Sequence, residues 1–240
     1  MIGGEKGLIF MFPCPIAEGD IGSLSPNALH WLRQTSHFIV ERAKTARHFL
    51  KQASHPLTMS GITILEMSDD DQGEMTRFLE LTLKGVNIGV LSEAGCPGIA
   101  DPGASVAAWA HNRNIRVVPF VGPSSIFLAL MASGFSGQSF AFHGYLSNKK
   151  PELVHQLRQL EASMLKTDQT QIFIETPYRN GFILETLLSC LKENTRLCIA
   201  CDIGSPNEDI IQQPVSKWRT ENSVNYHKRP CIYLIGSTSK

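Results

Sequence analysis

Short apolar runs alternate with amphipathic segments along the first half of the chain. The runs have the length and composition of β-strands, and they read "LIFMF", "HFIV", "ITILE", "VNIGVLS" and "IRVVPF". Helices are predicted between them, including "SPNALHWLRQT", which opens with a Ser-Pro start signal, and "AKTARHFLKQ". Another predicted helix ends at Gly85 and carries apolar residues at helical spacing, at Met75, Phe78, Leu79 and Leu83. This alternation over residues 8–120 predicts an open α/β sheet, in which "VNIGVLS" is buried on both faces.

A second set of strands and helices follows the turn "VGPSS". Its strand candidates read "SFAFHGYL", "TQIFIETP", "RLCIACDI" and "RPCIYLIG". One of its helices carries its apolar residues on one side, at Leu153, Leu157, Leu160 and Met164. We therefore predict an α/β protein of two domains, residues 1–122 and 123–240. A mostly parallel sheet is expected in the first domain, a mixed sheet in the second, and the cofactor cleft between them.

Composition limits the classes of partner. The chain has 240 residues, 42% of them hydrophobic, which is enough for a sizeable core. Its 22 Lys and Arg balance its 22 Asp and Glu, so any surface that attracts nucleic acid has to be local. No apolar run approaches the roughly 18 residues of a membrane span, and the N-terminus lacks the long apolar region of a signal peptide. We expect a soluble cytoplasmic protein with no membrane partner.

The cysteines and acidic residues do not predict a metal site. Cys198 and Cys201 form a CxxC inside a strand candidate, and residues three apart on a strand point to opposite faces. No second pair completes a zinc site, so we expect buried structural thiols. The eight histidines show neither HxxxH nor HxH spacing. The run Asp69–Asp71 is predicted to cap the helix that follows it.

The stretch "LSEAGCPGIADPGASV" continues the strand "VNIGVLS" and contains Gly95, Gly98 and Gly103. Open α/β sheets bind ligands outside the carboxyl ends of their strands, where glycines let the backbone approach closely. Asp101 and Pro102 also form a helix N-cap signal. An ordinary strand-to-helix connection explains that signal but not the length of the loop, so we predict a ligand-binding loop.

The turn "VGPSS" also follows a strand and opens a helix. Ser124 and Ser125 would lie beside free backbone N–H groups, which suit a carboxylate or a phosphate. Simple N-capping by Ser124 would explain the same residues, and both interpretations stay open. The chain contains neither GxxxxGK[ST] nor GxGxxG, so neither a P-loop nor a dinucleotide site is expected.

Several segments together resemble one protein family. "LSEAGCPGIADPG", "VGPSSIFLALMASGF", "FAFHGYLSNKK" and "IFIETPYRN" are similar, in order and spacing, to motifs of the tetrapyrrole methylase superfamily. "FMFPCPIAEGDI" resembles the family's first strand and turn. The resemblance implies an S-adenosylmethionine-dependent methyltransferase of two α/β domains that forms a homodimer. It indicates in particular the branch that methylates a ribose 2′-hydroxyl of small-subunit ribosomal RNA.

The cofactor that the resemblance implies is S-adenosyl-L-methionine. Its ribose hydroxyls suit a carboxylate acceptor, and its methionine carboxylate suits backbone N–H groups at a helix start. The expected cofactor contacts are Pro15, Ser92, Glu93, Ala94, Gly95, Ala100, Asp101, Ser124 and Ser125 in the first part of the chain. Glu175, Ala200 and Ile232 are added by resemblance to family positions.

The sequence leaves the catalytic base open. Glu41 and Tyr178 are candidates, and a structural role would explain each of them as well. The residues expected to bind the acceptor form a local basic rim of Arg42, Lys44, Arg47, Lys149 and Lys150, with Arg179 as a further phosphate ligand. A solvated surface would explain the same charges, and Arg179 could instead pair with Glu175.

Three segments depart from the family pattern. Ala17 and Glu18 replace a glycine and an asparagine, residues 41–44 lack an aspartate, and residues 201–208 lack two basic side chains. The changes fall at positions expected to face the methyl acceptor, whereas the cofactor loops are kept. Three functions stay open: a methyltransferase acting on RNA, one acting on a small molecule such as a tetrapyrrole, and a non-catalytic cofactor-binding module.

Overall fold

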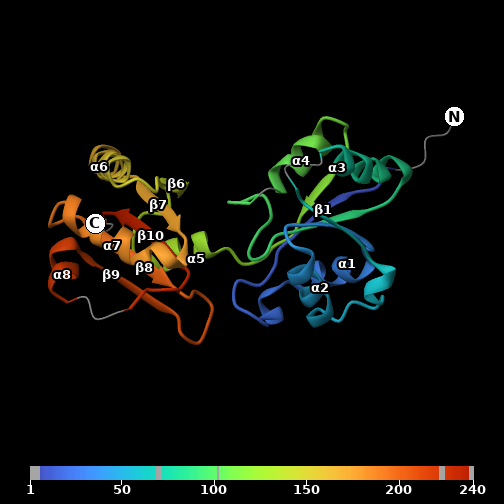
Figure 1. Cartoon of the computed structure of the whole chain (residues 1–240), viewed down its shortest axis with the longest axis horizontal. Helices are drawn as coiled ribbons and strands as arrows, with labels where there is room; N and C mark the ends of the chain where they lie inside the picture. The colour runs from blue at the N-terminus through green and yellow to red at the C-terminus, as the bar shows by residue number, and fades with distance from the viewer. Residues whose placement is uncertain (1–5, 69–71, 102, 222–224, 238–240) are drawn as a thin grey trace. The chain divides into compact units, whose positions relative to one another are not determined.

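The computed structural model describes residues 6–68, 72–101, 103–221 and 225–237. The chain divides into two compact units, Met1–Ser124 and Ser125–Lys240, and each is described by itself (Figure 1). The described part of the chain contains no helix that is long and apolar enough to cross a membrane.

The first unit is built on a five-stranded parallel sheet. Its strands are β1 (Ile9–Phe12), β2 (His37–Val40), β3 (Thr63–Glu66), β4 (Ile88–Leu91) and β5 (Val117–Pro119). Their order in the sheet is β3-β2-β4-β1-β5, and every neighbouring pair is parallel. All residues of β4 are buried, as its lack of alternation predicts.

Helices cover both faces of this sheet (Figure 1). On one face, α1 (Pro26–Gln34) and α2 (Ala43–Gln52) pack against Phe10 and Phe38. On the other face, α3 (Gln72–Leu79) and α4 (Gly103–His111) pack against Ile9 and Ile39. Three short 3-10 helices lie at Ile21–Ser23, Met59–Gly61 and Glu80–Lys84. Burial of the two apolar layers is the main favourable term for folding of this unit.

The helices that follow two neighbouring strands of the first sheet lie on opposite faces of that sheet. After β1 the chain runs to α1 on one face, and after β4 it runs to α4 on the other, although β1 and β4 are adjacent. Such a reversal leaves a crevice at the carboxyl ends of the two strands, which is where open α/β sheets bind ligands. The topology therefore brings the turn after Phe12 and the glycine-rich loop after Leu91 to one edge.

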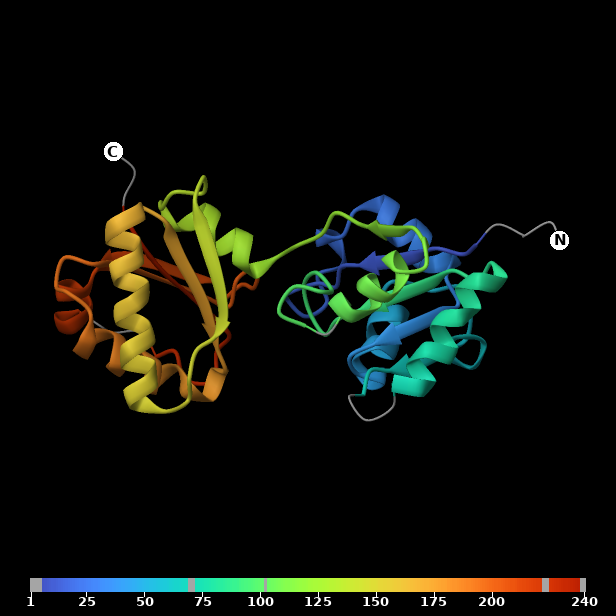
Figure 2. The ribbon, with the colours of Figure 1, turned by 90° about the horizontal axis from the view of Figure 1, so that it is seen from above.

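The second unit contains a mixed sheet with helices on both faces (Figure 2). Its strands are β6 (Phe140–Tyr145), β7 (Thr170–Glu175), β8 (Arg196–Cys201), β9 (Asp209–Pro214) and β10 (Cys231–Gly236), in the order β6-β7-β10-β8-β9. β6 and β7 are parallel, and the other pairs are antiparallel. The helices α6 (Lys150–Thr167), α7 (Asn180–Cys190) and α8 (Val215–Thr220) bury one face, and α5 (Ser125–Ser133) packs on the other. A 3-10 turn, Pro177–Arg179, precedes α7.

These two sheets confirm the predicted fold class. The bounds of β2 and α2 are those of the predicted segments, and Ser25 caps α1 by accepting from Ala28 N at 3.2 Å. The prediction of one continuous helix up to Gly85 is wrong at its end, because the chain tightens to a 3-10 helix at Glu80. That change of period takes Leu83 off the buried stripe and leaves it 46% exposed. The run Asp69–Asp71, predicted to cap α3, lies outside the described residues.

Candidate functional site

A backbone bridge joins the turn after β1 to the loop after β4. Cys14 N donates to Gly95 O at 2.8 Å, and Gly95 N donates to Cys14 O at 3.0 Å. Gly95 has a φ of +75°, in the left-handed region that favours glycine. A Cβ at Gly95 would lie 3.7 Å from Ile16 Cγ2 and 3.8 Å from Pro123 O, so it would fill open space without striking the fold.

The turn after β5 lies against both of these segments. Gly122 permits this approach, because a Cβ there would come within 2.2 Å of the Pro13 ring. The Cys96 thiol donates to Pro123 O at 3.3 Å. The fold thus brings the two glycine-rich turns into contact, with Ser124 directly after this turn and Ser125 at the start of α5.

Polar side chains inside the long loop bond mainly to the loop itself. Asp101 Oδ1 accepts from Gly98 N at 2.5 Å and from Gly103 N at 3.0 Å, which fits its expected role at the start of α4. Ser92 Oγ donates to Ala94 O at 3.3 Å. Ala100 adopts a φ of +64°, a conformation that costs a residue with a side chain about 1–3 kcal/mol. These contacts hold the shape of the loop, and contact of Ser92, Ala100 and Asp101 with a cofactor stays a prediction.

Carboxylates from three strand ends gather at the start of α2. Glu66 Oε2 accepts from Ala43 N at 2.7 Å, and Glu41 Oε2 accepts from Glu93 N at 3.0 Å. Glu93 Oε2 lies 3.5 Å from Arg42 Nε. Glu41 therefore holds the backbone of the glycine-rich loop, and Arg42, predicted to bind the acceptor, is paired with a predicted cofactor residue.

A hollow of about 760 Å³ opens between the turn after β1, α2 and the start of the glycine-rich loop. Five predicted site residues line it, namely Pro15, Lys44, Arg47, Glu93 and Ala94. Predicted cofactor and acceptor residues thus share one hollow at the carboxyl edge of the sheet. Sequence reasoning missed His48 and Lys51, which also line it. The available signal was the spacing of Lys44, Arg47, His48 and Lys51, which puts all four on one side of α2.

In the second unit, Arg179 pairs with Glu175. Glu175 is 5% exposed, and its Oε1 accepts from Thr176 N at 2.7 Å. Arg179 Nη2 lies 3.3 Å from Glu175 Oε2, but that oxygen accepts no hydrogen bond within the described residues, so the contact is an ion pair without hydrogen-bond alignment. The alternative in which Arg179 pairs with Glu175 is therefore confirmed, and a phosphate contact of Arg179 stays a prediction.

Ala200 and Ile232 lie opposite each other on adjacent strands. They are Cα partners in the pairing of β8 with β10, and their exposed fractions are 0% and 7%. Glu175 is the Cα partner of Cys231, the residue before Ile232, so strand alternation puts Glu175 on the other face of the sheet. The three second-domain positions expected to meet the cofactor therefore divide between two faces, and their contact with it stays a prediction.

The remaining predicted site residues of the second unit lie at its surface. Tyr178 is 73% exposed, and its ring meets the His227 ring edge-on at 6.5 Å between centroids. Lys149 pairs with Glu152 at 3.2 Å, and Lys150 pairs with Glu185 at 3.4 Å. Exposed pairs of this kind contribute little to stability, about 0–1 kcal/mol. Their predicted roles toward the acceptor remain predictions.

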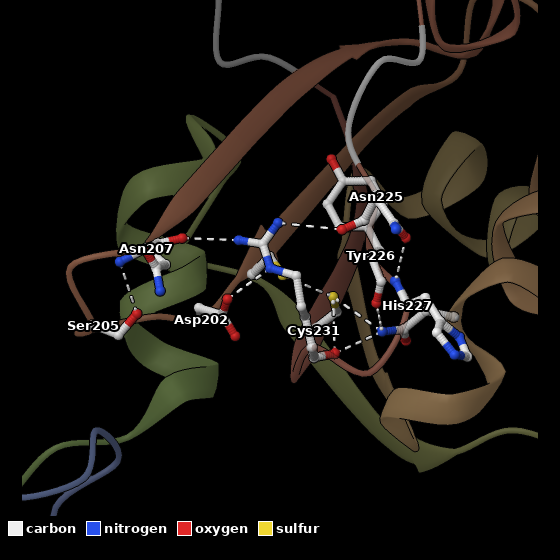
Figure 3. A network of polar contacts seen from close by, with 10 residues as sticks. Asp202, Ser205, Asn207, Asn225, Tyr226, His227 and Cys231 are labelled. Carbon is white, nitrogen blue, oxygen red and sulfur yellow. Dashed lines mark hydrogen bonds and ion pairs between the residues drawn. The ribbon is translucent and has the colours of Figure 1, made fainter.

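A polar network connects the β8–β9 turn to the segment before β10 (Figure 3). Arg229 Nε donates to Asp202 Oδ2 at 2.6 Å, and Arg229 Nη2 donates to Asn207 O at 2.8 Å. The buried amide of Asn180 donates to Tyr226 O at 2.8 Å and to Arg229 O at 2.6 Å. The turn at residues 201–208, which lacks the family's basic residues, is thus held by an arginine from a distant segment, which sequence reasoning missed.

Four of the six cysteines are buried, Cys96 and Cys190 are partly buried, and two of the buried thiols are in contact. Cys198 and Cys201 point to opposite faces of β8, and burial raises the pKa of Cys198 to about 12. Cys201 lies beside Cys231, whose thiol donates to it at 3.3 Å between sulfurs, and this contact raises the pKa of Cys231. Burial also raises the pKa of Cys14, at the backbone bridge, to about 12. Within the described ranges, no group of three or more His, Cys, Asp or Glu is placed to hold a metal ion.

Known proteins match most of the chain. Residues 17–218 match the family described as Tetrapyrrole (Corrin/Porphyrin) Methylases, and the chain belongs to this family of S-adenosylmethionine-dependent methyltransferases. A methylase family implies S-adenosylmethionine as the methyl donor. The family and enzyme class that the motifs predict are thereby confirmed.

Three relatives carry the name ribosomal RNA small subunit methyltransferase I. The protein from Synechocystis sp. is 31% identical over 239 residues, which are 97% of this chain and 80% of that protein. The Leptospira biflexa protein is 29% identical over 239 residues, or 98% of this chain and 93% of its own length. The Vibrio cholerae protein is 28% identical over 231 residues, or 95% of this chain and 76% of its own length.

Proposed function

We propose that this chain transfers a methyl group from S-adenosylmethionine to RNA of the small ribosomal subunit, at a ribose 2′-hydroxyl. The observation that carries the proposal is the contact between the two glycine-rich turns at the reversal of strand order, beside a hollow with basic side chains on one wall. The names of relatives aligned along nearly the whole chain support the substrate class.

The turns around Gly95 fit the methyl donor. A Cβ at Gly95 would occupy free space at the carboxyl edge of β4, so the glycine leaves room there for a ligand. Pro15, Glu93 and Ala94 line the adjoining hollow, and we assign them to the same contact. When bound, the cofactor supplies an electrophilic methyl group on a positively charged sulfur. The Glu93 carboxylate would stabilise that charge, in competition with its ion pair to Arg42.

The rest of the chemistry falls to residues that position the acceptor. Methyl transfer requires the acceptor oxygen in line with the methyl group, and orientation of this kind supplies a large share of the rate. The hollow beside the loop offers the acceptor a place next to the proposed cofactor contacts. Glu41 is our candidate for the base that accepts the proton of the 2′-hydroxyl. Its Oε2 already accepts a hydrogen bond from Glu93 N, which leaves Oε1 for this proton.

Calorimetric titration tests the cofactor half of this proposal. S-adenosylmethionine and its demethylated product should both bind, whereas NAD and ATP should not, because the chain lacks the loops those nucleotides need. Tight binding of NAD without binding of S-adenosylmethionine would overturn the assignment.

Mass spectrometry of ribosomal RNA tests the acceptor half. Small-subunit RNA from a strain lacking the gene should lose one 2′-O-methyl mark, and expression of the chain should restore it. An unchanged RNA in both strains would exclude this acceptor.

A small-molecule acceptor such as a tetrapyrrole is the second candidate. It is favoured by the apolar side of the hollow, where Ile16 and Phe49 lie, and by the description of the family itself. Incubation with a porphyrin or corrin precursor, followed by mass measurement of the product, separates this candidate from the first.

We further propose, from the family resemblance, that the chain works in the cytoplasm as a homodimer. Light scattering during gel filtration should give twice the mass of one chain. A mass equal to one chain at micromolar concentration would contradict the dimer.

A further inference from the structure

α2 carries a row of basic side chains to which the proposed methyl transfer assigns no specific contact. Lys44, Arg47, His48 and Lys51 follow the spacing i, i+3, i+4 and i+7, which places them on one side of a helix. All four are exposed, and all four line the hollow. The opposite side of α2 is buried in the core through Ala46, Phe49 and Leu50. We call Lys44, Arg47 and Lys51 the α2 stripe.

The α2 stripe has no acidic partner among the residues that the structure describes. None of its three side chains takes part in an ion pair with any residue that the structure describes. The other predicted acceptor cations are paired, such as Arg42 with Glu93. Two carboxylates, Glu18 and Glu93, also line the hollow, but Glu93 is already committed to Arg42. The stripe therefore leaves local positive charge on a chain whose formal net charge is zero.

We propose that the α2 stripe binds successive phosphates of the RNA strand whose nucleotide enters the hollow. This inference rests on the proposed function, because it takes RNA as the acceptor. Lys44 and Lys51 are seven residues apart, a rise of about 10 Å along the helix, so the three side chains are spread along a strand instead of gathered at one phosphate. Arg47 lies in the middle, where its guanidinium can hold one phosphate through two hydrogen bonds.

Phosphate contacts position a strand without reading its sequence. The α2 stripe therefore sets the affinity for RNA and its dependence on salt, while the cofactor contacts at the glycine-rich loop stay unaffected. On single strands, each phosphate neutralised contributes a slope of about −0.7 to the plot of log affinity against log salt. Three contacts then account for a slope of about −2, and for about 100-fold in affinity at 0.1 M salt.

The test compares two triple variants of the full chain that change net charge equally. The first is Lys44→Gln/Arg47→Gln/Lys51→Gln, in the stripe. The control is Lys84→Gln/Lys166→Gln/Lys217→Gln, at basic positions that do not line the hollow. Fluorescence anisotropy with a labelled single-stranded RNA of mixed sequence, over a series of salt concentrations, gives affinity and slope. Titration with S-adenosylmethionine shows that each variant is folded and keeps its cofactor site.

The stripe variant should bind RNA about 100-fold more weakly and with a slope smaller by about 2, while the control binds as the wild type does. Equal loss in the two variants would assign the effect to overall charge and overturn the inference. If the stripe variant binds RNA as tightly as the wild type does, the inference is also overturned. That result would not contradict the proposed methylation of RNA. If the wild type methylates no RNA and binds none, the proposed function and this inference both fail.

Discussion

Gly95 both shapes the glycine-rich loop and leaves the space that we assign to the cofactor. Its φ of +75° and its bridge to Cys14 fix the entry of the loop, while the space at its missing Cβ is open. A side chain there strains the backbone by about 1–3 kcal/mol and enters the space assigned to the cofactor. We therefore expect Gly95→Val to lose most of its affinity for S-adenosylmethionine and to melt only moderately earlier.

Gly134→Val is the matched control for that variant. Gly134 has a φ of +72°, and a Cβ there meets no atom within 4 Å. It should lose similar stability and keep normal cofactor affinity, both measured by melting curves and calorimetry. If Gly95→Val melts much earlier but binds the cofactor normally once folded, the loop is only a connection between β4 and α4.

Glu41 can act on a proton or only hold the loop, and two substitutions distinguish these roles. Glu41→Gln keeps an oxygen for the bond from Glu93 N but removes the basic carboxylate. Glu41→Ala removes both. A role as base predicts a loss of about 10²–10⁴-fold in kcat for either variant, with Tyr178→Phe as a comparison. Full activity in Glu41→Gln, together with a loss in Glu41→Ala, would make Glu41 a positioning residue.

Cys14 should make stability fall at alkaline pH. Burial raises its pKa from 9.0 to about 12, so the folded chain keeps a proton that the unfolded chain releases. Its contribution is complete below pH 9 and is lost as the pH rises from 9 toward 12. At pH 10 the loss is about 1.4 kcal/mol.

Urea unfolding at pH 8 and pH 10 measures this effect. The decrease in the free energy of unfolding should be smaller in Cys14→Ala than in the wild type by about that amount. An equal decrease in both proteins would show that Cys14 does not titrate in the folded protein as its burial implies.

The position of α2 depends on a cap from a neighbouring strand. Its N-cap residue, Arg42, provides no side-chain hydrogen bond, and Glu66 at the end of β3 accepts from Ala43 N instead. Glu66→Ala should lower the free energy of unfolding by about 1 kcal/mol and weaken RNA binding by displacing the α2 stripe. Glu185→Ala removes an exposed ion pair on α7 and should change stability by less than about 0.5 kcal/mol. Urea denaturation of both variants measures the difference between their free energies of unfolding. Equal stability of the two variants would show that Glu66 does not cap α2.

Elements with one clear buried face could be predicted from sequence, and an edge element could not. "AKTARHFLKQ" buries Ala46 and Leu50 at helical spacing, and α2 has the predicted bounds. β9 was missed because each of its residues is only half-buried, so "DIIQQP" shows no alternation between its two faces. The short α8 directly after Pro214 was missed with it. The two glycine-rich turns were predicted separately, but their contact follows from the order of strands, which no local pattern contains.

In the candidate site, too, the local features could be predicted from the sequence, and the contacts between distant segments could not. Glycines and serines that mark the loops are local signals, and the sequence predicts them. The pairing of Arg42 with Glu93 and of Glu66 with Ala43 joins segments that only the order β3-β2-β4 brings together. The stripe on α2 was visible as a spacing, but the absence of ion pairs between it and the described acidic residues is a property of the folded chain. Three of the five residues of the predicted basic rim, Arg42, Lys149 and Lys150, proved to be paired with carboxylates of their own unit.

The whole chain has no net charge, yet the relatives aligned along nearly its full length are named as enzymes of ribosomal RNA. A neutral protein can act on RNA when its unpaired cations are concentrated in one place. The α2 stripe beside the hollow provides such a place, and the glycine-rich turns next to it provide the proposed cofactor contacts. The first unit thus contains residues that we propose for binding both the methyl donor and the RNA strand.

Transfer of a labelled methyl group from S-adenosylmethionine to small-subunit ribosomal RNA tests this account most directly. The substrate is small ribosomal subunits from a strain that lacks the gene, and the products are digested to nucleosides and separated. The wild-type chain should place label in a 2′-O-methylated nucleoside of that RNA, and Gly95→Val should stay near background. A wild-type chain that binds S-adenosylmethionine, labels a porphyrin or corrin precursor and leaves the RNA unlabelled would contradict it.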